Sequence, residues 1–134
     1  MNKEQLCAAA QQARENAYAP YSQFTVGAAL LTESGKVYTG CNIENAAFSP
    51  TVCAERVALF KAVSEGERTF TALAAAGGKI GESTDITPCG VCRQTLSEFC
   101  DAAMPVYLVG ENGNVDTVTL GELLPRTFRL EEKG

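Results

Sequence analysis

The alternation of helical and β-prone segments constrains the fold of this chain more than any other feature. The spacing of apolar residues predicts helices over residues 2–18, 50–65, 89–99 and 119–124, and strands over residues 24–31, 37–42, 70–76, 106–109 and 115–118. The first two strands are separated by a short polar turn, which predicts an antiparallel hairpin. Helices that alternate with strands in this order are typical of an α/β sandwich around a mixed sheet.

Each expected helix begins at residues suited to capping. Asn2–Gln5 and Thr119–Glu122 have the spacing of a capping box, in which side chains bond to free backbone NH groups. Ser49–Pro50 and Thr87–Pro88 place a capping hydroxyl before a proline, which tolerates the first helical position. Residues 77–85 contain three glycines and few apolar side chains, so we expect a loop there.

The length and charge of the chain limit its partners. With 134 residues and 46% apolar content, we predict a single domain over residues 1–134. Apolar runs are interrupted every few positions and never approach the ~18 residues of a membrane span, so we expect no membrane partner. Residues 1–10 lack the apolar block of a secretory signal, which favours a cytoplasmic location. The net charge of −5 disfavours nucleic acid as the main partner, although a local basic groove is compatible with it.

The absence of histidine removes whole classes of chemistry. No Ser-His-Asp or Cys-His nucleophile can form, and any bound zinc must use sulfur or carboxylate ligands. The chain has six cysteines and no recognisable export signal. These cysteines are therefore better interpreted as thiols or metal ligands than as a disulfide framework.

Three of the cysteines fall near expected helix starts. Cys89 and Cys92 form a Cys-x-x-Cys pair at one start, and Cys53 lies near another. Helix N-termini favour thiolate over thiol, so these sulfurs could hold a tetrahedral zinc ion with water in the fourth position. From spacing alone the alternatives stay open: a closed structural zinc site with Cys41 or Cys100 as fourth ligand, a redox pair, or packed thiols without a chemical role.

Two segments of the chain together resemble the zinc-deaminase signature. Cys53–Glu55 and Pro88–Cys92 match it, with cysteine in the usual histidine position. Within that superfamily the closer resemblance is to the small tetrameric cytidine deaminases. It is carried, in order along nearly the whole chain, by Tyr18–Ser22, Asn42–Ala47, Cys53–Arg56, Pro88–Gln94 and Leu124–Pro125.

The resemblance implies a fold, a reaction and an assembly. The fold would be a three-layer α/β/α sandwich around a mixed five-stranded sheet. The reaction would be zinc-dependent hydrolytic deamination of cytidine and deoxycytidine to uridine and deoxyuridine, with release of ammonia, in pyrimidine salvage. The enzyme would be a cytoplasmic homotetramer with one Zn²⁺ per subunit and sites at subunit interfaces. The preference between ribose and deoxyribose is left open.

The resemblance also assigns the metal ligands and the catalytic group. Cys53, Cys89 and Cys92 would bind zinc, and Glu55 would carry protons from water to the ring nitrogen and the departing ammonia. Residues two apart on an ideal helix do not face each other, so the proximity of Glu55 to the metal rests on the family. Three thiolates leave zinc with a formal charge of −1, which Arg56 would offset as a donor to sulfur.

A control substitution follows from the proposed role of Arg56. We expect Arg56→Ala to lower activity or zinc retention more than Arg14→Ala does. The alternative interpretation of Arg56 is a weak surface salt bridge.

The resemblance assigns a further set of residues to the substrate. Asn42 and Glu44 would bind the ribose hydroxyls, Phe24 and Ala54 would line the pocket of the base, and Phe128 would reach into a neighbouring subunit's site. Without the resemblance, an Asn-containing loop is typical of turns, and phenylalanines of core or interface packing. Phe48 stands where related sequences often have tyrosine.

Three competing functions remain. One is a deaminase of another substrate, such as a nucleoside antibiotic or a base in RNA. The second is a structural zinc module that binds another protein. The third is a thiol oxidoreductase, which would remain active without zinc.

Overall fold

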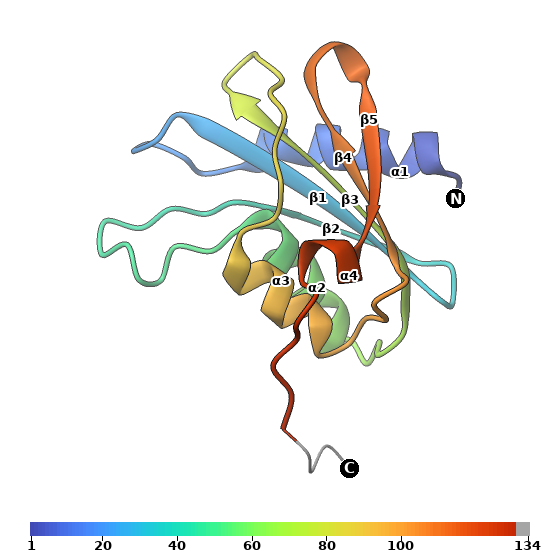
Figure 1. The fold of residues 1–134 in the computed structure, drawn as a ribbon. Coiled ribbons are helices and arrows are strands. Elements are labelled where there is room, and N and C mark those ends of the chain that lie inside the picture. Colours follow the sequence, from blue (N-terminus) through green and yellow to red (C-terminus); the bar gives the residue numbers. More distant parts are fainter. Residues whose placement is uncertain (131–134) are drawn as a thin grey trace.

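The five strands form one mixed sheet in the order β2-β1-β3-β4-β5 (Figure 1). The structure is a computed structural model and describes residues 1–130. The strands are β1 (Phe24–Thr32), β2 (Val37–Cys41), β3 (Phe70–Lys79), β4 (Pro105–Val109) and β5 (Val115–Thr119). β3 and β4 are parallel, and the other neighbouring pairs are antiparallel. The predicted mixed five-stranded sheet and its first hairpin are therefore confirmed.

Helices cover both faces of the sheet, as Figure 1 shows. They are α1 (Lys3–Ala13), α2 (Ala54–Ser64), α3 (Gly90–Ser97) and α4 (Leu120–Leu123), with 3-10 turns at η1 (Arg14–Asn16) and η2 (Glu111–Gly113). α1 lies behind the sheet in this view, whereas α2 and α3 pack on the opposite face. The three-layer α/β/α arrangement is thus confirmed. No helix within residues 1–130 is long and apolar enough to cross a membrane.

The sheet separates two apolar cores because successive side chains of a strand point to opposite faces. On β1, Ala29 packs in the core under α1, whereas Ala28 and Leu30 pack in the core under α2 and α3. β3 is the central strand, and the alanines at 72–76 are buried on both of its faces. Burial on both sides explains why this strand has a continuous apolar sequence instead of an alternating one.

Two glycines set the distance between the sheet and its helices. A Cβ atom on Gly40 of β2 would collide with the carbonyl oxygen of Ala54 at the start of α2. A Cβ atom on Gly27 of β1 would collide with the carbonyl oxygen of Ala10 in α1. The first turn of α2, which carries chemistry described below, therefore lies directly against β2.

Both predicted capping boxes are confirmed, at the start of α1 and at the start of α4. The Asn2 side chain accepts from the backbone NH of Gln5, and Thr119 does the same for Glu122. The predicted start of α2 at Ser49–Pro50 is wrong, because the helix begins at Ala54. Val52 instead forms an antiparallel bridge with Ile43 through two backbone hydrogen bonds of 3.0 Å, which keeps Val52 out of the helix.

The predicted start of α3 is shifted in the same direction. Cys89, and not Thr87, is the N-cap, and its sulfur accepts a hydrogen bond from the backbone NH of Cys92. Thr87 and Pro88 precede the helix as extended chain. Both corrections bring a cysteine to a helix cap: Cys53 caps α2 and Cys89 caps α3.

The predicted loop at residues 77–85 is wrong in its first three residues, because β3 extends to Lys79. Residues 80–85 form a turn and mostly irregular chain, as expected. Gly77, Gly78 and Lys79 pair with the first residues of β1. The guanidinium of Arg14 donates to the carbonyl oxygens of Gly78, Lys79 and Glu82 at 2.6 to 3.2 Å, which holds the strand end and the following turn. Tertiary hydrogen bonds thus override the low strand propensity of glycine. Of the predicted domain, residues 131–134 lie outside the described part.

Candidate active site

The sulfur atoms of Cys53, Cys89 and Cys92 lie within 4.8 Å of one another. The sulfurs of Cys53 and Cys89 are 3.6 Å apart. Cys53 caps α2, while Cys89 caps α3 and Cys92 lies in its first turn, so two helix N-termini meet at this cluster. The positive ends of both helices therefore stabilise negative charge on the sulfurs.

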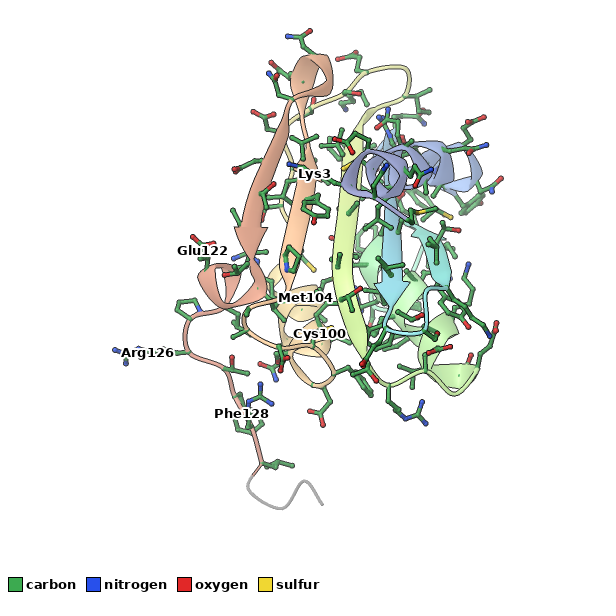
Figure 2. All side chains as sticks on the ribbon, turned by 90° about the vertical axis from the view of Figure 1, so that its right-hand side faces the viewer. Lys3, Cys100, Met104, Glu122, Arg126 and Phe128 are labelled. Atoms are coloured by element: carbon green, nitrogen blue, oxygen red, sulfur yellow. The ribbon has the colours of Figure 1, made fainter. Side chains whose placement is uncertain are left out.

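The two cysteines considered as fourth ligands do not join the cluster. Within residues 1–130, the group of potential metal ligands that contains these sulfurs consists of Cys53, Cys89 and Cys92. Cys41 lies on β2. Cys100 is buried in the core that also contains Met104, and Figure 2 labels Cys100 and Met104. The described protein groups thus supply three sulfur donors, which leaves a position of a tetrahedral ion for a non-protein ligand.

Arg56 supports negative charge on the sulfur cluster. Its Nη2 donates to the sulfur of Cys53 at 3.6 Å. The pKa of Cys53 is lowered to about 5, mainly by a hydrogen bond from the Cys92 thiol and also by the Arg56 guanidinium, against the opposing effect of burial. The bond with Cys53 together with burial raises the pKa of Cys92. Of these two thiols, Cys53 is therefore the one that ionises first.

The sulfur cluster opens into a cavity of about 480 Å³. Cys53 and Cys89 line it, together with Glu55 from the first turn of α2 and Phe24 from the start of β1. A larger cavity of about 660 Å³ lies beside Arg14, but none of the three cysteines lines it. The chemistry of the protein therefore belongs to the smaller cavity.

Glu55 is a carboxyl group held out of water inside this cavity. Its side chain is only 3% exposed. The pKa of Glu55 is raised to about 7, mainly by burial and also by negative charge on Cys53, against the opposing effects of a backbone hydrogen bond and of Arg56. A carboxyl group with this pKa both accepts and donates a proton near neutral pH, as a general acid–base requires.

The position of the helix start explains how Glu55 reaches the cysteines. The rule that residues two apart do not face each other applies within a helix. Cys53 lies outside the helix, with the extended dihedral angles φ −83° and ψ 158°. Its side chain can therefore line the same cavity as Glu55, which follows it by two residues.

Comparison with known proteins agrees with this geometry. The family described as "Cytidine and deoxycytidylate deaminase zinc-binding region" matches residues 1–108. The chain belongs to this deaminase family. The cytidine deaminase of Sporosarcina psychrophila is 52% identical over 132 residues, which cover 98% of this chain and 95% of that protein. The crystal structure of cytidine deaminase from Burkholderia pseudomallei has a TM-score of 0.88 at 46% identity and covers 96% of this chain and 100% of that chain.

A more distant member of the deaminase family has a different name. Blasticidin-S deaminase of Bacillus cereus is 32% identical over 108 residues, which cover 77% of this chain and 76% of that protein. Its identity to this chain is much lower than the 52% of the Sporosarcina psychrophila cytidine deaminase.

The sulfur cluster fits the zinc ion of the deaminase family. Tetrahedral zinc with bonds of about 2.3 Å to sulfur separates its sulfur ligands by about 3.8 Å. The Cys53–Cys89 separation of 3.6 Å is close to this value, and all three sulfurs lie within 4.8 Å. Within residues 1–130, the buried Nε of Arg56 has no hydrogen-bond partner, so this guanidinium keeps a donor near the sulfurs. Zinc is thus the cofactor of this chain.

Asn42 and Glu44 both line the cavity, but each is also held by the backbone. Asn42 accepts from the NH of Val26 at 2.8 Å and donates to the carbonyl of Phe24 at 2.9 Å. Glu44 accepts from the hydroxyl and the NH of Ser22, which lower the pKa of its carboxyl group. Both side chains are therefore fixed in position before any ligand binds.

The remaining expected substrate residues have different surroundings. Phe24 lines the cavity, whereas Ala54 is fully buried and does not line it. Phe128 is 68% exposed and does not line the cavity of its own chain. Phe48, at 75% exposed, has a left-handed backbone with φ 58° and lies at a small pocket that shares Ser22 and Glu44 with the main cavity.

Sequence reasoning missed several residues of the site. Ser22, Val26, Thr51, Val52, Ile86 and Thr87 line the cavity. Their proximity to the cysteines depends on tertiary pairing, and no local pattern marks it. Arg14→Ala is also unsuitable as the control for Arg56→Ala. It is only 8% exposed and donates to three carbonyl groups, so its loss would disturb the fold itself.

Proposed function

We propose that this protein hydrolyses the exocyclic amine of cytidine and deoxycytidine, giving uridine or deoxyuridine and ammonia. The observation that carries the proposal is a buried carboxyl group, Glu55, in one cavity with three clustered cysteine sulfurs. The identity of 52% with a relative named cytidine deaminase supports cytidine as the substrate. The product would enter pyrimidine salvage.

The metal ligands would be Cys53, Cys89 and Cys92, with one zinc ion per subunit. Zinc lowers the pKa of water toward ~7 and so supplies a nucleophile at neutral pH. Arg56 would withdraw charge from the sulfurs, because a thiolate that accepts a hydrogen bond from a guanidinium gives less negative charge to the metal. The two helix N-termini at Cys53 and Cys89 act in the same sense.

Glu55 would be the proton carrier of the reaction. Its carboxylate accepts a proton from the attacking water and delivers it to the ring nitrogen next to the amine. The carboxylate then takes the remaining proton of the hydroxyl group that has added to the ring carbon and delivers it to the amine, which leaves as ammonia while the C=O bond forms. The raised pKa of Glu55, caused mainly by burial, suits both directions of transfer.

Asn42 and Glu44 would bind the sugar. Each amide atom of Asn42 makes one backbone bond, which leaves one NH and one lone pair for a hydroxyl. Glu44 offers its carboxylate oxygens as acceptors, and its bonds from Ser22 hold it in place. Phe24 would flank the base, whereas the buried side chain of Ala54 does not reach the cavity. A free nucleoside fits this set, and the net charge of −5 disfavours a polynucleotide.

The active enzyme would be a cytoplasmic homotetramer whose sites lie at subunit interfaces. The support is a set of large apolar side chains that are more than half exposed: Tyr18, Tyr21, Phe48, Phe60, Val91, Phe128 and Leu130. Exposed apolar side chains in this number favour contact with other subunits. Phe128 would then complete the cavity of a neighbouring subunit.

The direct test follows the ultraviolet absorbance of cytidine mixed with the purified protein, in the unmodified chain and in Glu55→Gln. We expect Glu55→Gln to keep its zinc and to lose activity by about 10²- to 10⁴-fold, the usual contribution of a general acid–base. The matched control is Glu33→Gln, which changes an exposed carboxylate in the β1–β2 turn. It should alter neither zinc content nor activity. An unchanged absorbance with the unmodified, zinc-loaded protein would instead indicate a structural zinc module.

A further inference from the structure

Two adjacent residues of α3 hold the segment that follows α4. Arg93 donates from Nη1 to the carbonyl oxygen of Leu123 at 2.7 Å. Gln94 donates from Nε2 to the carbonyl oxygen of Phe128 at 3.0 Å. In Figure 2 this segment runs from the end of α4, next to Glu122, past Arg126 to Phe128. Its two ends are therefore tied to the helix that carries Cys92.

Arg93 also holds the chain that leads to the first sulfur of that helix. Its Nε donates to the carbonyl oxygen of Pro88 at 2.7 Å, and its Nη2 donates to the hydroxyl of Thr87 at 2.8 Å. Cys89 follows directly. One guanidinium thus bonds both to the segment that precedes Cys89 and to the end of α4.

The geometry of these bonds makes them restrictive. All three acceptors are neutral oxygens within 2.8 Å of a charged donor, which is the range of strong charge-assisted hydrogen bonds. The planar fork of arginine fixes the three donors relative to one another, which a lysine ammonium cannot do. Arg93 does not line the cavity, so it acts on the site through the groups that it holds.

We propose that Arg93 is a positioning residue that couples zinc retention to substrate affinity. It holds the Thr87–Cys89 segment for the metal and the end of α4 for the segment that carries Phe128. Gln94 holds only the segment that carries Phe128. The inference deepens the proposed function and rests on it for the substrate, whereas its metal part requires no deamination.

The test compares Arg93→Gln with Gln94→Ala, its neighbour on the same helix, in the full zinc-loaded protein. Transfer of zinc to a chromogenic chelator should become about tenfold faster in Arg93→Gln, as for groups that orient metal ligands. In the same variant KM for cytidine should rise more than kcat falls. Gln94→Ala should raise KM but release zinc at the wild-type rate. Arg93→Lys should resemble Arg93→Gln, because one ammonium cannot replace three fixed donors.

Several outcomes would overturn the proposal. Wild-type zinc release and KM in Arg93→Gln would do so, even if its melting temperature fell, because a purely structural role predicts that result. Equal zinc release in the Arg93 and Gln94 variants would refute the division of tasks. If Arg93→Gln does not fold, Thr87→Val removes one acceptor alone, and zinc release at the wild-type rate in that variant would refute the metal part. Wild-type protein that binds zinc but leaves cytidine unchanged would defeat the proposed function while the zinc-release comparison still stands.

Discussion

At the scale of single residues, Arg56 links the sulfur cluster to its surroundings, because its guanidinium bonds to Cys53. Arg56 carries the prediction at this scale. Because its Nη2 donates to the sulfur of Cys53 at 3.6 Å, we expect Arg56→Ala to weaken zinc retention or activity by about 10- to 100-fold. Zinc content after dialysis and kcat with cytidine are the two measurements. Arg68→Ala replaces Arg14→Ala as the control, since Arg68 is exposed and bonds only to nearby backbone carbonyls. Equal losses in both variants would refute a role for Arg56 at the sulfurs.

The three cysteines of the site were identifiable from the sequence because their types and spacing are specific, and the structure brings their sulfurs within 4.8 Å. The place of Glu55 was not derivable from periodicity, because that reasoning put Cys53 inside the helix. The missing information was the bridge between Val52 and Ile43, which delays the helix until Ala54.

At the level of elements, the number and order of strands and helices were predictable, but several boundaries were not. The sequence predicts a helix cap correctly where the bonded residues are close in sequence, as at Asn2 and Thr119. It fails to predict a boundary where a segment distant in sequence bonds to the same backbone groups. β3 continues through Gly77 and Gly78 because β1 and Arg14 supply hydrogen-bond partners there.

Two glycines allow an element-scale prediction. Gly40→Ala should push the first turn of α2 away from β2 and destabilise the fold by about 1–3 kcal/mol, the usual cost of overpacking. It should also speed zinc release, because that turn follows Cys53. Gly27→Ala is the matched control: it collides with α1 on the other face of the sheet. Denaturant unfolding should show similar destabilisation of both variants, and faster zinc release in the Gly27 variant as well would contradict the argument.

The whole molecule is the scale at which the sequence says least on its own. The assembly expected from the resemblance leaves no local pattern, and exposed aromatic residues such as Phe48 and Phe128 become visible only once the chain is folded. Their exposure is the property that a second copy of the chain would remove. A small pocket at Phe48 adjoins the cavity, since Ser22 and Glu44 line both.

Mixed subunits test whether Phe128 acts in a neighbouring site. Phe128→Ala alone should raise KM for cytidine without loss of zinc, and Glu55→Gln alone should be nearly inactive. When the two variants are co-expressed in one oligomer, about one site in four should combine an intact Glu55 with an intact Phe128 from the other subunit. Activity with wild-type KM should therefore return. Native mass spectrometry that shows mixed tetramers without this recovery would place Phe128 in the site of its own chain.

The buried alanines of β3 have a consequence for engineering the substrate range. Residues 72–76 face a helix layer or the core on either side and leave no space for larger side chains. The lining of the cavity comes instead from segments outside or at the ends of the strands, at 22–26, 42–44, 51–55 and 86–89. Libraries that aim at new nucleosides should therefore vary these segments and leave the central strand unchanged.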